Sequence, residues 1–213
     1  MKEKRLVWRI IVYITGLFVL SCGVVFAINS DLGVSPVNSL PYITSLILQT
    51  QIGMLTTIML IAFMALQLMI LRKDYKWINL TQIIFSFIFG FFLNFAIWLI
   101  GDLHIPTYFG RLGMLAISIV LIAAALVLIM GARLVILPPE GLCVAIASKI
   151  KNGKFHVVKM FFDSALVAAS IALSFIFLGE LQGVREGTVI SALAIGKIIP
   201  YVKKLLNPIL NKL

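Results

Sequence analysis

The chain has 213 residues, of which 62% are hydrophobic and only 12% are charged, and its formal net charge at pH 7 is +10. Soluble globular proteins are about 45–50% apolar and about 25% charged, so this composition excludes a soluble monomer, a disordered chain and a disulfide scaffold. At about 20 residues per membrane helix, the length suits roughly six spans with short loops. The excess of Lys and Arg is typical of cytoplasmic loops of membrane proteins, so no nucleic-acid partner is expected.

Six long apolar segments predict six transmembrane helices, because none of them alternates polar and apolar residues as a barrel strand does. We place these spans at residues 6–28, 53–71, 77–100, 111–136, 156–178 and 187–202. The whole chain, residues 1–213, is therefore expected to form a single integral membrane domain of the all-α class.

The basic residues predict the orientation of these spans. They gather at the N-terminus, between spans 2 and 3, between spans 4 and 5, and in or after span 6, and only Arg111 and Arg185 fall on the other side. Because Lys and Arg are enriched in cytoplasmic loops, both termini are expected in the cytoplasm of a plasma-membrane protein. Spans 1, 3 and 5 then run outward.

The two halves of the chain resemble each other. Pro36 aligns with Pro138 and Leu40 with Leu142, which suggests a first repeat over about 6–100 and a second over about 111–206. Each repeat holds three spans, an odd number, so the second must enter the membrane from the opposite side, as in many secondary transporters. The alternative is that apolar helices align by composition alone.

A short apolar segment follows the first span of each repeat. Segment 36–49 begins with a proline after Ser35, and segment 138–150 begins with two prolines and Glu140, all of which are typical of helix starts. Neither segment is long enough to cross a bilayer. They form either two half-helices whose N-termini point at the bilayer centre, or two helices that lie on the two membrane surfaces.

Candidate substrate-binding residues are the polar side chains of these segments and spans. In the half-helix arrangement, Asn38 and Glu140 would meet near the bilayer centre, where they could bind a cation or proton or orient a polar solute. A first-turn preference also explains Glu140. Gln82 and Asn94 belong to a stripe with a four-residue period, which lines a solute path or only packs helices together.

Two further candidates carry charge inside the predicted spans. Asp163 and Lys197 both lie roughly 9–10 Å from the cytoplasmic ends of their helices, at 1.5 Å per residue. Ionisable residues at such depth are costly and often functional, so the two could pair. Alternatively, Lys197 extends to the interface while Asp163 pairs with Lys159, four residues earlier on the same helix.

The sequence offers no pattern for a metal, a cofactor or a catalytic centre. The two histidines and the two cysteines, Cys22 and Cys143, stand far apart in the chain, and no nucleophile and base occur at a recognisable spacing. We therefore expect no metal, no cofactor and no enzymatic activity.

Three stretches carry a resemblance to a known family: Asp31–Pro36, Leu137–Gly141 and Glu186–Lys197. On these stretches the chain resembles the YczE/YyaS/YitT-type bacterial integral membrane proteins, most closely the YczE branch, over essentially its whole length. The Gly187-Thr188 element of the third stretch is degraded in the first repeat, which has Leu80-Thr81. The resemblance implies a multi-span plasma-membrane protein without an established chemistry, and it supplies no catalytic residue.

These observations favour a small-solute transporter or channel whose partners are the lipid bilayer and an unidentified small solute. A non-transporting membrane regulator or assembly partner is the main alternative, although the short loops offer few residues for contact with other proteins. An intramembrane enzyme is a third, weaker hypothesis. A homo-oligomer is compatible with the sequence.

Overall fold

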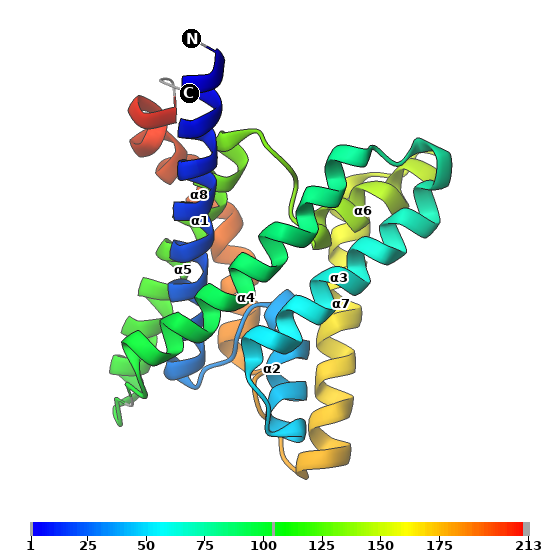
Figure 1. The fold of residues 1–213 in the computed structure, drawn as a ribbon. Coiled ribbons are helices and arrows are strands. Elements are labelled where there is room, and N and C mark those ends of the chain that lie inside the picture. The colour runs from blue at the N-terminus through cyan, green and yellow to red at the C-terminus, as the bar shows by residue number, and fades with distance from the viewer. Residues whose placement is uncertain (1, 104, 211–213) are drawn as a thin grey trace. The chain divides into compact units, whose positions relative to one another are not determined.

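The computed structural model describes residues 2–103 and 105–210, and within these residues the chain forms helices and no strand (Figure 1). The predicted all-α class is confirmed. The helices are α1 (Lys2–Ser30), α2 (Pro36–Leu48), α3 (Ile52–Leu71), α4 (Thr81–Ile100), α5 (Tyr108–Ala132), α6 (Pro138–Lys149), α7 (Phe155–Leu173) and α8 (Glu186–Leu210). Two 3-10 turns, η1 (Arg72–Asp74) and η2 (Trp77–Leu80), join α3 to α4, and a π-helical segment, η3 (Ser174–Leu178), prolongs α7.

Five helical stretches in the described residues are long and apolar enough to cross a membrane. They are Arg5–Ser30, Ile52–Asp74, Trp77–Ile100, Tyr108–Ala132 and Phe155–Leu178. Each coincides with one of the first five predicted spans to within a few residues. The sixth predicted span lies within α8, which is a helix of 25 residues but is interrupted by charged residues such as Lys197 and Lys203. The chain is thus a membrane protein by the length and composition of its helices.

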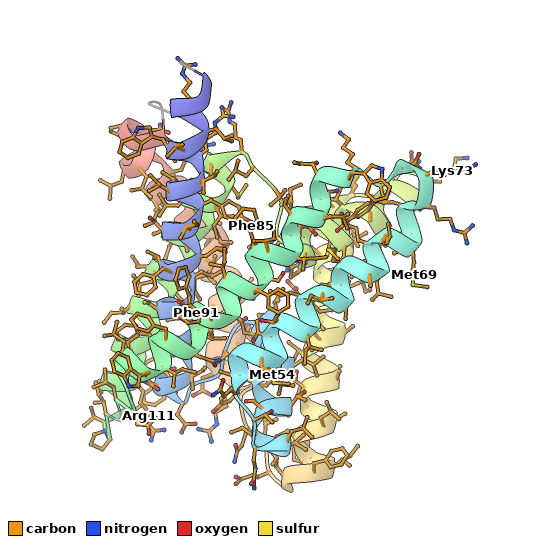
Figure 2. The ribbon with its side chains drawn as sticks, in the orientation of Figure 1. Met54, Met69, Lys73, Phe85, Phe91 and Arg111 are labelled. Carbon is orange, nitrogen blue, oxygen red and sulfur yellow. The ribbon has the colours of Figure 1, made fainter. Side chains whose placement is uncertain are left out.

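Large apolar side chains are exposed on these helices. Met54 and Met69 of α3 are 56% and 69% exposed (Figure 2). Phe91 and Trp98 of α4 are also largely exposed, as is Ile176 in η3. In water such surfaces would be unfavourable, whereas the hydrocarbon core of a bilayer accommodates them.

The chain divides into two compact units, and each unit draws segments from both halves of the sequence. The first unit contains Met1–Ser35, Phe91–Leu134 and Gly183–Leu213, and the second contains Pro36–Gly90 and Val135–Gln182. Helix α4 begins in the second unit and ends in the first.

In the first unit, α5 packs against both α1 and α8. The α1–α5 contact is close because Gly16 and Gly23 lie in it. A Cβ atom on either glycine would lie 2.8 Å from the side chain of Ile129 or Ile122, respectively. Ser118 of α5 also donates a hydrogen bond of 2.7 Å to the carbonyl of Gly23. Small residues and hydroxyl hydrogen bonds of this kind are typical of helix packing in membranes.

The ends of the first unit show which way its helices run. At one end, Asp31 after α1 accepts hydrogen bonds from Arg111 at the start of α5 and from Arg185 just before α8, at 2.9 and 3.0 Å. Helix α1 therefore ends where α5 and α8 begin, and it runs opposite to both. The charge pattern requires these relative directions for spans 1, 4 and 6.

In the second unit, α2 and α6 each pack against α3 and α7. On the α6 side, Cys143 and Ala147 pack against Val158 of α7. Phe63 of α3 meets Phe162 of α7 edge to face, with ring centroids 5.2 Å apart. Through these contacts the two short helices are held between two of the candidate spans.

Candidate functional site

The two short helices begin at the prolines that the sequence indicated. Helix α2 starts at Pro36 and has 13 residues, and α6 starts at Pro138 and has 12. Proline suits the first turn because it lacks the N–H group that would have no intrahelical acceptor there, and its φ is already helical. Both prolines are buried, so each helix begins inside the second unit.

Helix α7 contacts the first turns of both short helices, on either side of its middle. Ser39 in the first turn of α2 lies 2.9 Å from Ser170, measured between the hydroxyl oxygens. Glu140 in the first turn of α6 lies 3.7 Å from Lys159, measured from Oε1 to Nζ, and Lys159 is paired with Asp163. Asp163 and Ser170 are separated by roughly 10 Å at 1.5 Å per residue, with the midpoint of Phe155–Leu178 between them.

From these starting points the two short helices run in opposite directions along α7. Helix α2 also contacts η3, which lies at the C-terminal end of α7. Helix α6 ends at Lys149, and residues 150–154 lead from there directly into the start of α7 at Phe155. The N-terminus of each helix is thus directed towards the middle of α7, and its C-terminus towards one of the two ends.

Charged side chains gather where α6 begins. The Lys159 Nζ atom lies 2.7 Å from Asp163 Oδ1 and 3.7 Å from Glu140 Oε1. The side chains of Lys159, Asp163 and Glu140 are only 22%, 25% and 29% exposed. One ammonium group therefore faces two partly buried carboxylates, and the three groups carry a net charge of −1 when all are ionised.

Two buried glutamines flank the same helix start. Gln67 of α3 is 4% exposed, and a Cβ on Gly141, next to Glu140, would lie 2.9 Å from its Oε1 atom. Gln82 of α4 is 2% exposed and donates a hydrogen bond of 3.0 Å from Nε2 to the carbonyl of Ile136, two residues before α6. Side chains from α3, α4 and α7 thus surround the first turn of α6.

Three oxygen atoms at this position are buried without a hydrogen-bond partner in the described part of the chain: Gln67 Oε1, Gln82 Oε1 and Glu140 Oε2. Buried polar atoms are rarely unpaired, and each unpaired atom costs about 1–3 kcal/mol. Each is an acceptor of the kind that a cation or an N–H or O–H group satisfies. We call the cluster of Gln67, Gln82, Glu140, Lys159 and Asp163 the α6 site.

Of the six predicted site residues, three belong to the α6 site: Gln82, Glu140 and Asp163. Asn38 lies in the first turn of α2, beside Ser39, and that turn contacts α7 at Ser170, whereas Glu140 contacts α7 at Lys159. Asp163 pairs with Lys159, which is one of the two arrangements that the sequence left open. Asn94 and Lys197 belong to the first unit, where Lys197 is exposed.

The polar stripe of α4 makes different contacts along its length. Gln82 donates to the carbonyl of Ile136 beside the α6 site. Further along, the carbonyl of Ser86 accepts a hydrogen bond of 3.3 Å from the Thr57 hydroxyl, and Gly90 lies against Gly53 and Thr57 of α3. The middle of the stripe therefore packs α4 against α3.

Sequence reasoning missed Gln67 as a site residue and treated Lys159 only as a local partner of Asp163. Gln67 lies within a span whose other polar side chains are those of Thr56 and Thr57, and a strongly polar amide in that position is itself a signal. The role of Lys159 could not be found from one helix, because its second carboxylate comes from α6, 19 residues earlier in the chain.

The chain belongs to a family of unknown function (DUF6198), whose model matches residues 7–204. The match covers α2 to α7 completely and most of α1 and α8, so it includes segments of both units. No curated protein and no solved structure matches the chain.

Proposed function

We propose that the chain is a plasma-membrane transporter or channel for a small polar solute, of the YczE type within the YczE/YyaS/YitT proteins. The observation that carries this proposal is the position of the two short helices, whose N-termini face α7 on either side of its middle. Paired half-helices of this kind hold substrates and ions near the bilayer midplane in many secondary transporters.

The proposed architecture has six spans, with α8 as the sixth, arranged as two inverted repeats. Two pairs of equivalent helices support it. Helix α1 runs opposite to α5, and α2 runs opposite to α6. An inverted repeat requires both of these reversals, because the second copy enters the membrane from the other side. The distribution of Lys and Arg would place both termini in the cytoplasm.

The α6 site would then lie within the membrane. Phe155–Leu178 is a candidate span, so its middle would fall near mid-depth of the bilayer. Helices of 12 or 13 residues cannot cross a bilayer, and helices that begin beside the middle of α7 would enter it from opposite faces. Lys159 and Asp163 lie four and eight residues into this span, roughly 6 and 12 Å from its start at 1.5 Å per residue. Ionisable groups within a span are costly and are retained mainly where they bind or move a solute or an ion.

The chemistry of the α6 site favours a cation or a solute rich in hydrogen-bond donors. Its unpaired atoms are acceptors, and its charged groups sum to −1. An anion would add repulsion to two carboxylates, whereas Na⁺, a proton or a small amine would be attracted by them.

The experiment is flux into liposomes that contain only this protein. We would follow uptake of labelled Na⁺, K⁺ and methylammonium, proton entry with an internal pH dye, and uptake of a neutral polyol. We expect flux of at least one probe, and Glu140→Gln should lower it at least about tenfold, a loss of about 1.4 kcal/mol in barrier terms. Glu186→Gln, the same change at an exposed position of α8, is the matched control and should leave flux unchanged.

Two results would contradict the proposal. The first is flux no higher than in protein-free liposomes for every probe, which would favour a regulator or assembly partner. The second is equal flux in Glu140→Gln and the unaltered protein, which would remove the α6 site from the solute path.

A further inference from the structure

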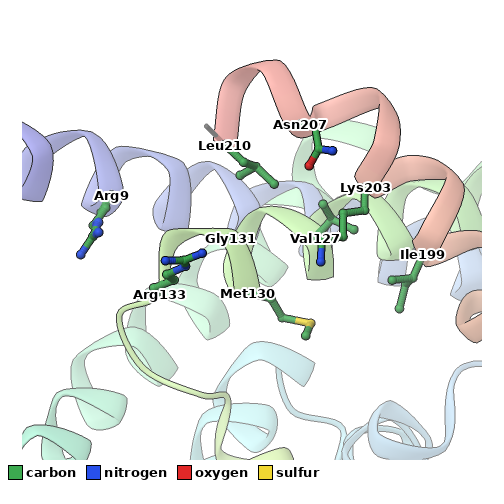
Figure 3. A pocket seen from close by; sticks show the side chains of 9 residues that line it. All are labelled: Arg9, Val127, Met130, Gly131, Arg133, Ile199, Lys203, Asn207 and Leu210. Carbon is green, nitrogen blue, oxygen red and sulfur yellow. The ribbon is translucent and has the colours of Figure 1, made fainter. Parts of the chain in front are cut away.

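A pocket of about 500 Å³ lies in the first unit among α1, α5 and α8 (Figure 3). Arg9 contributes to it from the first turns of α1, Arg133 from the residue that ends α5, and Lys203 with Asn207 from the C-terminal part of α8. The pocket therefore lies at the opposite end of the unit from Asp31, where α1 ends and α5 begins. Its volume is in the range of pockets that hold small ligands.

The pocket is strongly cationic. Three of its nine lining residues are basic and none is acidic. Among the side chains that the structure describes, no carboxylate forms a salt bridge with Arg9, Arg133 or Lys203. The Arg9 Nε atom is buried and has no hydrogen-bond partner in the same set of residues. Buried donors are normally paired, so this N–H group lacks the acceptor that an anion would supply.

The rest of the lining is apolar and includes Val127, Met130 and Ile199. Val127 is 4% exposed, whereas Met130 is 70% exposed, so the apolar lining extends from the interior to the outer surface of α5. A free phosphate ion would use the cationic groups and leave this apolar surface uncovered. A phospholipid would place its phosphate among the cations and its glycerol and acyl carbons against the apolar side chains.

We infer that this pocket binds the headgroup of an anionic phospholipid such as phosphatidylglycerol. The cations lie at the ends of membrane helices, which is the level of lipid headgroups, and basic pockets between helices are known to select anionic lipids there. Arginine suits this role because its planar guanidinium can donate two hydrogen bonds to one phosphate. The pocket lies wholly in the first unit, so this inference does not depend on solute flux through the α6 site.

The test is lipid binding by the full chain in detergent, measured by native mass spectrometry and by the shift of the thermal unfolding midpoint. Phosphatidylglycerol, phosphatidylcholine and inorganic phosphate are added separately. We expect phosphatidylglycerol alone to bind and to raise the midpoint. In the triple variant Arg9→Gln, Arg133→Gln, Lys203→Gln its affinity should fall by about five-fold for each cation, on the order of a hundredfold in all.

The matched control removes the same charge from exposed residues outside the pocket, in the triple variant Lys73→Gln, Lys76→Gln, Lys151→Gln. This variant should bind phosphatidylglycerol as the unaltered protein does. An equal loss of phosphatidylglycerol affinity in both triple variants would show that the lipid is attracted by the overall charge of the protein. That result would contradict binding at the pocket. If phosphatidylcholine bound as tightly as phosphatidylglycerol, the pocket would not select an anionic headgroup, and the proposal would be wrong. Full stabilisation by inorganic phosphate would assign the pocket to a free anion instead of a lipid.

A single substitution tests the same proposal if the triple variant does not fold. Asn207→Asp places a carboxylate among the three cations at an exposed position of α8. It should weaken phosphatidylglycerol binding by about five-fold or more, because the new carboxylate competes with the phosphate for the same donors. Unchanged binding in Asn207→Asp would contradict the proposal even if the triple variant were unstable.

Discussion

The hydroxyl oxygens of Ser39 and Ser170 lie 2.9 Å apart, although 131 residues separate the two serines in the chain. Each hydroxyl also lies within hydrogen-bonding distance of a carbonyl on its own helix, Pro36 for one and Leu166 for the other. Two hydroxyl protons therefore face three possible hydrogen bonds, so one of the three is always unmade. The contact joins the start of α2 to α7 at a position where both side chains are fully buried.

Replacing Ser39 or Ser170 by alanine should destabilise the protein modestly. Each variant loses the hydrogen bond between the helices but leaves the remaining serine bonded to its own carbonyl, so we expect a loss of about 0.5–1.5 kcal/mol. The double variant should lose about the sum of the two single losses, because two hydroxyl protons make two bonds and each single variant removes one of them. Unfolding midpoints in detergent compare the three variants. No loss in either single variant would contradict the hydrogen bond between the helices.

Gly90 makes the close contact between α4 and α3, so its replacement should be costly. A Cβ atom there would lie 2.0 Å from Thr57 Oγ1 and 2.5 Å from the Gly53 carbonyl oxygen, which requires the helices to separate. We expect Gly90→Ala to destabilise the protein by about 1–3 kcal/mol. Gly113→Ala, in α5, is the matched control because nothing lies within 4 Å of its Cβ position. The same unfolding assay should show little change for Gly113→Ala, and equal losses in the two variants would refute the packing argument.

The spans and the short helices were predictable because their signals are local. An apolar run of about 20 residues has few alternatives to a helix, and the predicted span 77–100 coincides with the stretch Trp77–Ile100. The helix starts at Pro36 and Pro138 were equally accessible, since proline in the first turn acts through its own ring and missing N–H group. Each of these features depends on neighbours in the sequence.

The α6 site was only partly predictable because its contacts are not local. The sequence showed that Asp163 had either Lys159 or Lys197 as a partner, and only the packing of α6 on α7 brings Glu140 to the same ammonium group. Gln67 is adjacent to Gly141 through the packing of α3 on α6, and no spacing in the sequence records it. Hydrophobic patterns in membrane helices identify spans better than partners, because lipid-facing and protein-facing surfaces are both apolar.

The orientation in the membrane can be checked by cysteine labelling. In a background without Cys22 and Cys143, single cysteines are introduced at Lys151 and at Glu180, which are exposed and lie beyond opposite ends of α7. Because Lys and Arg surround the loop at 151, we expect it in the cytoplasm. A membrane-impermeant thiol reagent on intact cells should label the cysteine at position 180 and spare that at 151 until the cells are opened. Labelling of the position 151 variant alone would reverse the topology, and labelling of both would remove α7 as a span.

The central ammonium group of the α6 site should matter more for stability than either of its carboxylates. Lys159→Met leaves both Glu140 and Asp163 without their cation in a partly buried position, so we expect a loss of about 3–5 kcal/mol. Asp163→Asn leaves Lys159 with Glu140 and should cost only about 1–2 kcal/mol. The double variant should be more stable than the two single losses predict, because the second change removes a carboxylate that the first left unpaired.

Lys197→Met tests whether this coupling is specific to Lys159. Lys197 is exposed in the first unit, so its effect should add to that of Asp163→Asn without coupling. Thermal unfolding in detergent of the three single variants, the two double variants and the unaltered protein measures both cycles under one set of conditions. Strong coupling of Asp163 with Lys197, and none with Lys159, would mean that the acid changes its partner in the functional protein. Coupling with Lys159 alone would keep Asp163 on the same ammonium group as Glu140, which supports a cation and not an anion as the occupant of the α6 site.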